Sequence, residues 1–322
     1  KKWKSRKKMV AMQGWGTADT EALISFVARD KTPVFSASYS GHLTDPTGKN
    51  PNTKKPAPYN FFYGASYSDA CRGLVQWAAE DWKAKGGEGK PKFTHIGANH
   101  PFPNAPKEAC AEYATELGFD VQAPVVVSMK PGDFKAQCLS IKSSGSNYGY
   151  IGNLGGSVLS LVKSCNTVGT KIQLMSNIWG GDKKTFAAAG EGIKDYIFPA
   201  MTPFWNDDVP GMKLVREISK MSDSSGKKER VHHYMRGVCS TYFMKEAMEW
   251  AKTNIPEGET IFNCNWDDFP KMFFLDTKHN YVYGLDPNYL YTQDPELWKL
   301  LKDITVGKIE DPAPAIVEEF KS

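Results

Sequence analysis

The sequence lacks several features that would assign it to a class at once. No apolar run approaches the ~18 residues that a membrane-spanning helix needs, and no signal peptide opens the chain. Charge of either sign is nearly balanced, with 40 Lys and Arg against 36 Asp and Glu in 322 residues, a net charge of +4. This balance argues against a nucleic acid as partner, and we expect the basic cluster at residues 1–8 to be a solvated terminus.

Signatures of catalysis and cofactor binding are also scarce. The six cysteines form no C-x-x-C pair and no zinc spacing, so we favour buried free thiols, although their even number permits disulfides. Gly14-x-Gly16 is not a dinucleotide fingerprint, because Asp19 stands where the third glycine is needed. No G-x-S-x-G elbow supports Ser-His-Asp catalysis. We therefore predict a protein that is not an enzyme, with no catalytic residue, metal or cofactor.

Two histidines, His232 and His233, invite a metal interpretation. Adjacent residues point about 100° apart on a helix, so the pair would chelate poorly without partners. We expect them to form the solvated start of a helix. His42 and His100 lie in loops near strand ends, where a role as a base is the less favoured alternative.

What the chain does contain is a regular alternation of strand and helix patterns. An apolar strand pattern at 92–97 precedes a helical pattern at 107–117, and further strands are expected at 121–127, 148–151 and 193–200. Strands that alternate with amphipathic helices are typical of βαβ units. The sequence therefore predicts an α/β fold with parallel sheets.

Polar turns follow the first two expected strands. The turn Gly14-Trp15-Gly16-Thr17 precedes a helix, and the loop Ser36-Ala37-Ser38-Tyr39-Ser40 follows the next strand. Open α/β sheets bind ligands at the carboxyl ends of their strands, and hydroxyls beside a helix N-terminus suit a carboxylate. We expect a binding site here. The alternative is that Thr17 only caps its helix and the serines only satisfy their loop.

Laid out in order, residues 1–255 resemble the branched-chain amino-acid type of periplasmic solute-binding protein, the type I substrate-binding component of ABC transporters. The resemblance lies in the order and spacing of several segments. These are Gly14–Thr17, Pro33–Ser40, Tyr59–Phe62, Tyr67–Asp69, Lys92–Gly97, Lys130–Phe134, Tyr148–Gly156 and Asn177–Gly180.

The resemblance implies two doubly wound parallel-sheet lobes that close on a ligand about a hinge. Thr17, Ser38 and Ser40 are then carboxylate-binding positions, and Tyr150 and Trp179 are contacts from the second lobe. An aromatic pocket would be lined by Tyr39, Tyr150, Trp179 and Trp205, with packing roles for two of the four as the alternative. Trp179 stands where relatives for aliphatic amino acids commonly carry an acid, which argues against a simple aliphatic amino acid. The implied ligand is an amino acid or a related small carboxylate, aromatic carboxylates included.

The implied domains are a first lobe of residues 1–65 plus 201–255, a second lobe of 66–200, and a segment of different character at 256–322. The family's first βαβ units are missing, so the first lobe is incomplete and we expect N-terminal sequence to have been lost. Residues 262–320 weakly resemble the C-terminal segment of bacterial membrane proteins of the glycosyltransferase type. That resemblance rests on Trp266–Pro270 and Gly284–Pro287, and an α+β structure is expected there.

The function that follows is a periplasmic or extracytoplasmic receptor that delivers a small molecule to the permease of an ABC importer. Two alternatives stay open. One is a glycosyltransferase-associated fragment or fusion, in which Asp267, Asp268 or Asp286 would bind a metal or a sugar nucleotide. The other is a sensory ligand-binding domain that serves no transporter.

Overall fold

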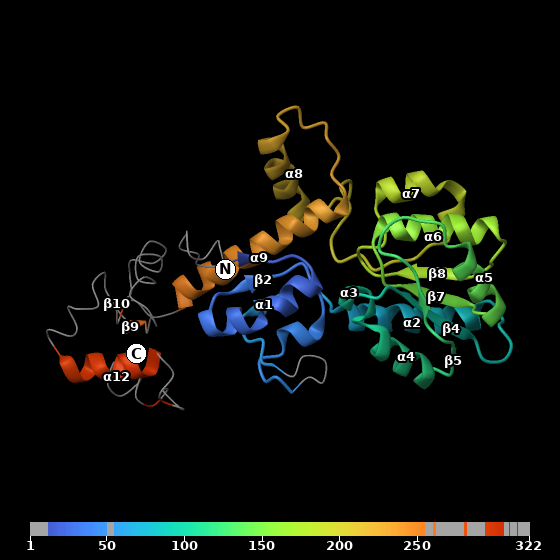
Figure 1. Cartoon of the computed structure of the whole chain (residues 1–322). Coiled ribbons are helices and arrows are strands. Elements are labelled where there is room, and N and C mark those ends of the chain that lie inside the picture. The colour runs from blue at the N-terminus through green and yellow to red at the C-terminus, as the bar shows by residue number, and fades with distance from the viewer. Residues whose placement is uncertain are drawn as a thin grey trace. The chain divides into compact units, whose positions relative to one another are not determined.

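The computed structural model describes residues 12–49, 55–254, 260–261, 280–281, 294–305, 309 and 314. The chain divides into two compact units, Gln13–Tyr242 and the combination of Lys1–Met12 with Phe243–Ser322. The first unit contains every residue predicted for the binding site. It runs from blue to orange in Figure 1.

A small sheet carries the first predicted turn. Its strands are β1 (Met12–Gln13), β2 (Val34–Phe35) and β3 (Asn60–Phe61), in the order β1-β2-β3. The pairing of β2 with β3 is parallel. Helix α1 (Thr17–Asp30) connects β1 to β2, and the 3-10 helix η1 (Gly41–Thr44) follows the second turn.

A larger sheet forms the rest of this unit. Its central strand β4 (Lys92–Gly97) pairs in parallel with β7 (Tyr148–Ile151), which pairs in parallel with β8 (Gln173–Ser176). On its other side β4 pairs with β5 (Asp120–Val121) and β6 (Val125–Val126). The predicted parallel α/β architecture is therefore confirmed.

Helices cover both faces of the larger sheet. Helices α2 (Tyr67–Ala84) and α4 (Lys107–Glu116) pack on one face around a cluster that includes Phe93 and Tyr148. Helices α5 (Lys135–Ser144) and α6 (Gly155–Thr167) pack on the other face around Ile96 and Ile151. Figure 1 shows α4 and α6 on opposite sides of the strands. Successive residues of a strand point to opposite faces, so the buried strands β4 and β7 supply both cores.

The start of α2 follows the expected capping chemistry. The Ser66 hydroxyl accepts a hydrogen bond from the backbone N–H of Asp69, at 3.1 Å. Such a bond satisfies one of the donors that a helix N-terminus leaves unpaired. The buried residues Leu74 and Ala78, one turn apart, then face the core.

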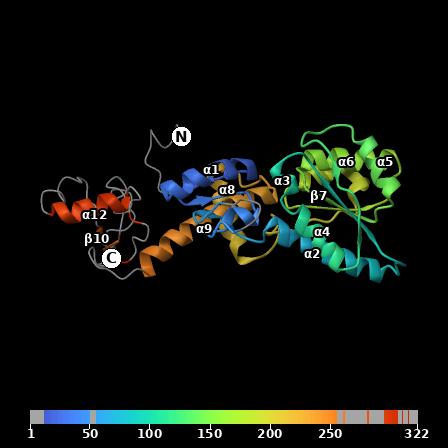
Figure 2. The same ribbon diagram turned by 60° about the horizontal axis from the view of Figure 1, so that its bottom comes forward.

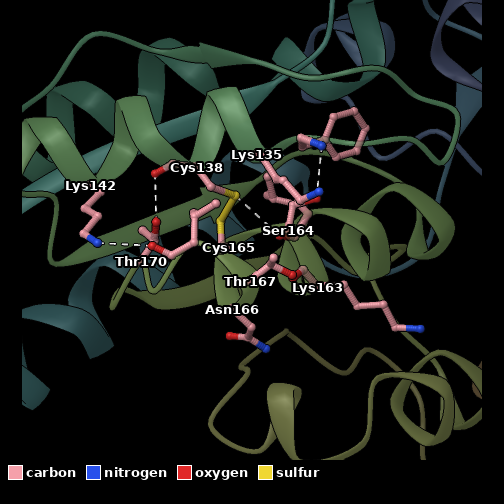
Figure 3. Close-up of a disulfide and its surroundings, with 12 residues drawn as sticks. Lys135, Cys138, Lys142, Lys163, Ser164, Cys165, Asn166, Thr167 and Thr170 are labelled. Atoms are coloured by element: carbon pink, nitrogen blue, oxygen red, sulfur yellow. Dashed lines mark hydrogen bonds between the residues drawn. A yellow bond between two sulfur atoms is a disulfide. The ribbon is translucent and has the colours of Figure 1, made fainter.

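Four cysteines form two disulfides, which corrects the expectation of free thiols. Cys71 of α2 is bonded to Cys110 of α4, with the Cα atoms 5.9 Å apart. Cys138 of α5 is bonded to Cys165 of α6, with the Cα atoms 4.9 Å apart (Figure 3). Each pair joins two helices on the same face of the sheet, at separations of 39 and 27 residues. Helix packing brings the pairs within bonding distance, which no short sequence spacing could indicate.

Two predicted strands are wrong in detail. The expected strand at 121–127 is divided into β5 and β6, because Pro124 lies between them and has no N–H to donate to the sheet. The expected strand at 193–200 is reduced to one bridge between Met175 and Ile197. It is preceded by the 3-10 helix η2 (Gly190–Ile193), which follows α7 (Lys183–Ala189) directly.

Three further helices belong to the chain from Pro101 to Asn254. The short α3 (Pro101–Asn104) lies between α1 and the larger sheet in Figures 1 and 2. Helix α8 (Pro210–Ser222) and helix α9 (His232–Asn254) follow the larger sheet in sequence. None of the described helices is both long enough and apolar enough to span a bilayer.

In the second unit the structure describes few elements. Strands β9 (Thr260–Ile261) and β10 (Asn280–Tyr281) pair in parallel, and helix α12 (Pro295–Thr305) follows. The segments Trp266–Pro270 and Gly284–Pro287, on which the second resemblance rests, lie outside the described residues. That resemblance stays a prediction.

Candidate ligand-binding site

The N-terminus of α1 brings the three predicted hydroxyl residues together. The Thr17 Oγ1 atom lies 2.8 Å from Ser38 Oγ and 3.3 Å from Ser40 Oγ. All three residues are at most 1% exposed. Gly16 is the N-cap of α1 and has no side chain to cap the helix, so Thr17 is not the capping residue. Its hydroxyl is used in the contact with the serine loop instead.

Gly14 explains why the two turns meet. A Cβ atom at this position would lie 2.9 Å from Val34 Cγ1, so a side chain would separate β1 from β2. With glycine there, the Gly14 N–H donates to the Phe35 carbonyl at 2.9 Å, and the Ala37 N–H donates to the Gly14 carbonyl at 3.3 Å. The close approach places the turn after β1 beside the loop after β2.

A cavity of about 230 Å³ opens beside Thr17, and Ser38 and Ser40 are not among the residues that line it. One side is formed by the start of α1 and the serine loop, and the other by residues that belong to the larger sheet's part of the chain. The first side comprises Trp15, Gly16, Thr17, Ala18, Asp19 and Ala37, and the second comprises Tyr67, His100, Phe102, Met129, Leu154 and Trp179.

Trp179 is the predicted second-lobe contact that lines this cavity. Its backbone N–H donates to Asn177 Oδ1 at 2.6 Å, and its indole Nε1 donates to Tyr67 Oη at 2.9 Å. These two bonds fix the ring in the turn after β8. The ring centroid lies 5.9 Å from that of Trp15, a side chain that is 70% exposed. Two indole rings, one from each side, therefore border the cavity.

Tyr39 lies behind the cavity and not on its surface. It is 2% exposed, packs edge-on against Tyr63 and Tyr67, and stacks on Trp179 with centroids 5.9 Å apart. Burial raises the pKa of the Tyr39 hydroxyl, which therefore stays protonated near neutral pH. The structure gives Tyr39 a supporting position beneath Trp179.

Tyr150 lies in the core, away from the position implied by the resemblance. It is 0% exposed in β7 and stacks on His95 with ring centroids 5.7 Å apart. Its side chain joins the cluster beneath α2 and α4, because it shares the face of β7 that Tyr148 presents. It is not among the residues that line the cavity.

Several cavity residues were missed by the sequence analysis as binding residues. His100 follows β4 and begins α3, where its Nδ1 accepts a hydrogen bond from the Phe102 backbone N–H at 3.2 Å. Leu154 lies after β7 and is the N-cap residue of α6. Both stand just beyond the carboxyl end of a parallel strand. Applying the strand-end rule to every strand of the larger sheet would have indicated them.

The first turn of α9 packs against Trp179 from another direction. Arg236 is 2% exposed, and its guanidinium carbon lies 4.6 Å from the centroid of the Trp179 ring. One Arg236 nitrogen donates to the Ile178 carbonyl at 2.5 Å, and another lies 3.1 Å from His233 Nδ1. Burial lowers the pKa of Arg236 to about 10, so it remains charged near neutral pH. Among the described residues, no carboxylate forms an ion pair with it.

Of the two histidines of α9, His232 is buried and His233 is partly buried, so the expected solvated helix start is wrong. His233 stacks on Trp179 with centroids 5.2 Å apart, and His232 packs against Phe198 and Phe204. His232 is 4% exposed, and burial lowers its pKa to about 3. Within the described part of the chain, no three His, Cys, Asp or Glu side chains gather as a possible metal site.

Residues 1–263 match the family model described as "Periplasmic binding protein". No curated protein gives a significant match.

Three solved structures illustrate the likeness in fold. A branched-chain amino acid ABC transporter protein from Thermus thermophilus with bound valine has a TM-score of 0.66 and 23% identity, over 78% of this chain and 62% of its own. An ABC transporter substrate-binding protein from Aeropyrum pernix has a TM-score of 0.66 and 24% identity, over 76% and 61%. A solute-binding protein from Rhodopseudomonas palustris BisB5, in complex with 3,4-dihydroxybenzoic acid, has a TM-score of 0.54 and 13% identity, over 74% and 61%.

The chain thus spans only about three-fifths of the length of these proteins. Identities of this size support a shared fold. The family match extends over residues 1–263 of 322, well over half of the chain. With the parallel sheets described above, it shows that this chain belongs to the periplasmic binding protein family.

Proposed function

We propose that the chain is a solute-binding receptor that binds a small carboxylate, of the amino-acid or aromatic-acid class, and delivers it to the permease of an ABC importer. The observation that carries this proposal is the hydroxyl cluster of Thr17, Ser38 and Ser40, at a helix N-terminus beside a cavity. Thr17 lines the cavity, and Ser38 and Ser40, which do not line it, are hydrogen-bonded to Thr17 from behind.

The chemistry of this end of the cavity suits an anion. The N-terminus of α1 carries unpaired N–H groups and the positive end of the helix dipole. Thr17 adds a hydroxyl that already shares hydrogen bonds with two serine hydroxyls. A carboxylate oxygen accepts from N–H and O–H groups together, and both are present here.

The second side of the cavity supports a binding mechanism by closure. Thr17 and Trp179 come from parts of the chain built on different sheets, and both line the same space. A ligand that touches both stabilises the closed arrangement relative to the open one. We propose that residues 1–65 plus 201–255 and residues 66–200 are the two lobes that move.

The cysteine chemistry supports an extracytoplasmic location. Both disulfides lie in the part of the chain built on the larger sheet. Disulfides persist mainly in oxidising compartments such as the periplasm.

The relatives with bound valine and bound 3,4-dihydroxybenzoic acid have the same fold and bind ligands of the two proposed classes.

Isothermal titration calorimetry tests the proposal. Valine, leucine, phenylalanine, benzoate and 3,4-dihydroxybenzoate are titrated into the wild type, Ser38→Ala and Ser40→Ala, with Ser140→Ala on the exposed side of α5 as the matched control. We expect at least one carboxylate to bind, and both site variants to bind it more weakly than the control does. Unchanged binding by both variants would move the site elsewhere. If no carboxylate binds, the proposed ligand class is wrong.

A further inference from the structure

The same cavity supports a narrower inference about the ligand, which rests on the proposed function. We propose that the ligand is a single-ring aromatic carboxylate that carries no α-ammonium group. Its carboxylate lies at the Thr17 end of the cavity, and its ring lies against the indoles of Trp15 and Trp179, whose centroids are 5.9 Å apart.

The wall opposite Thr17 has no charged side chain. Phe102, Met129, Leu154 and Trp179 are apolar, and the wall's polar groups are those of Tyr67 and His100. An α-ammonium group that loses its water needs a carboxylate or several acceptors in return. This wall offers a Tyr67 hydroxyl that already accepts from Trp179, and a His100 Nδ1 that already accepts from Phe102. An aromatic ring needs neither.

The charge behind the wall also favours an anion. Arg236 lies directly behind the Trp179 ring, buried and without a carboxylate partner among the described residues. Its Nε has no hydrogen-bond partner either. In the poorly screened interior a positive charge raises the potential of the nearby cavity. That potential attracts a carboxylate and opposes an ammonium group.

Asp19 is the one carboxylate among the residues that line the cavity. It lies on the same side as Thr17, whereas an acid that pairs with an α-ammonium group would have to lie on the opposite wall. It is exposed in the first turn of α1, two residues after Thr17. Water screens an exposed carboxylate, so its attraction for an ammonium group is weak. Its negative charge lies close to the anion end, where it lowers the affinity for a carboxylate. Removal of the Asp19 charge should therefore raise the affinity for a carboxylate.

Size and polarity complete the description of the ligand. The cavity, at about 230 Å³, is smaller than the roughly 300–1,000 Å³ of pockets for drug-sized molecules, which suits one ring. Because His100 Nδ1 accepts from a backbone N–H, the ring proton belongs on Nε2, which is left to donate. One acceptor on the ligand ring, such as a hydroxyl oxygen, matches this donor.

The experiment compares ligands that differ in one group. Benzoate, 4-hydroxybenzoate and phenylacetate are titrated into the full chain by calorimetry, beside L-phenylalanine, which adds the ammonium group, and benzamide, which removes the charge. We expect the aromatic acids to bind at least tenfold more tightly than L-phenylalanine and benzamide. Tryptophan fluorescence follows the same titrations, because Trp15 and Trp179 border the site.

Two variants test the two halves of the inference. Asp19→Asn is expected to strengthen benzoate binding two- to threefold, because it removes a negative charge beside the anion. Trp179→Glu is expected to weaken benzoate binding at least tenfold and to favour L-phenylalanine. Trp179→Phe, which keeps an aromatic ring, serves as the control for folding.

The outcomes separate this inference from the function on which it rests. Binding of L-phenylalanine as tight as that of benzoate would overturn the inference and leave the receptor function standing. Binding of benzamide as tight as that of benzoate would overturn the anion end, and weaker benzoate binding by Asp19→Asn would overturn the charge argument. If none of the carboxylates, leucine and valine included, binds, the inference and the proposed function fail together.

Discussion

The buried guanidinium of Arg236 donates a hydrogen bond to the backbone carbonyl of Ile178, at 2.5 Å. Ile178 belongs to the turn after β8, and Arg236 belongs to α9. Helix α9 is also bonded to β1, because Gln13 Nε2 donates a hydrogen bond to Thr241 Oγ1. The contact of Arg236 with Ile178 therefore links a helix beside the small sheet to the turn that carries Trp179. It holds a positive charge behind the cavity and fixes the wall of that cavity at the same time.

Arg236→Met tests the role of this charge. We expect the affinity for benzoate to fall about fivefold, close to 1 kcal/mol of binding free energy, because the attraction for the anion is lost. Arg236→Lys keeps the charge and is expected to stay within about twofold of the wild type. Calorimetry in low and high salt measures both. A loss for neutral benzamide equal to that for benzoate would show that the substitution acts through packing alone.

Thr17→Val removes the hydroxyl that joins the polar cluster. Ser38, which is 0% exposed, then loses its 2.8 Å partner in a place that water does not reach. A buried polar group left unpaired costs about 1–3 kcal/mol, so the free energy of unfolding should fall by that amount. Thr17→Ser retains the hydroxyl and should cost less. Urea denaturation of the two variants gives the comparison, and equal losses would contradict the proposed hydrogen bonding.

The disulfide between Cys138 and Cys165 should stabilise the larger sheet's part of the chain. It closes a loop of 27 residues, for which the entropic stabilisation is about 3.5 kcal/mol. We expect Cys138→Ala with Cys165→Ala to lower the free energy of unfolding by about this amount. Cys239→Ala is the matched control, because Cys239 is a free and only partly buried cysteine. A double variant as stable as this control would contradict the prediction.

Acid should weaken the fold before most carboxylates titrate. Burial lowers the pKa of His95 and of His233 to about 4 and that of His232 to about 3, all below the ~6.5 of an exposed histidine. As the pH falls from about 6.5 to 4, these histidines therefore bind more protons in the unfolded chain than in the folded chain. Stability is complete above this window and declines within it, by up to about 1.4 kcal/mol per pH unit for each histidine.

Urea denaturation at pH 7.5, 6.5, 5.5 and 4.5 measures this slope. His95→Leu should reduce the slope, because the substitution removes one of the three histidines whose pKa is lowered, whatever it does to the stability at pH 7.5. The control is His100→Leu, a position with a partly exposed ring in a loop. Identical slopes for His95→Leu and the wild type would exclude His95 as a source of the pH dependence.

The sequence predicted the sheet of parallel strands because the periodic signal was strong there. The observed β4 and β7 coincide with the predicted 92–97 and 148–151, and both are continuous buried strands. The expected strand at 193–200 was wrong because an apolar run does not show whether a neighbouring strand is close enough to pair with it. Here a 3-10 helix occupies its beginning and one bridge remains.

For the candidate site, the hydroxyl cluster was predictable and most of the opposite wall was not. Thr17, Ser38 and Ser40 follow two adjacent strands, so topology alone brings them together. Tyr150 lies in the core because β7 is buried on both faces, and no residue of β7 lines the cavity. The burial of His232 and Arg236 depends on how α9 packs against the turn at Trp179, a contact across 57 residues of chain that leaves no local pattern.

The placement of both disulfides has a consequence for how the molecule melts. The larger sheet is reinforced on each face by one cross-link, whereas the strands of the small sheet are two residues long. The two regions should therefore lose structure in separate cooperative steps, with the small sheet first. A ligand that touches both sides of the cavity would merge these steps into one transition. Calorimetric scans should then show two unfolding peaks without ligand and a single peak when the cavity is occupied.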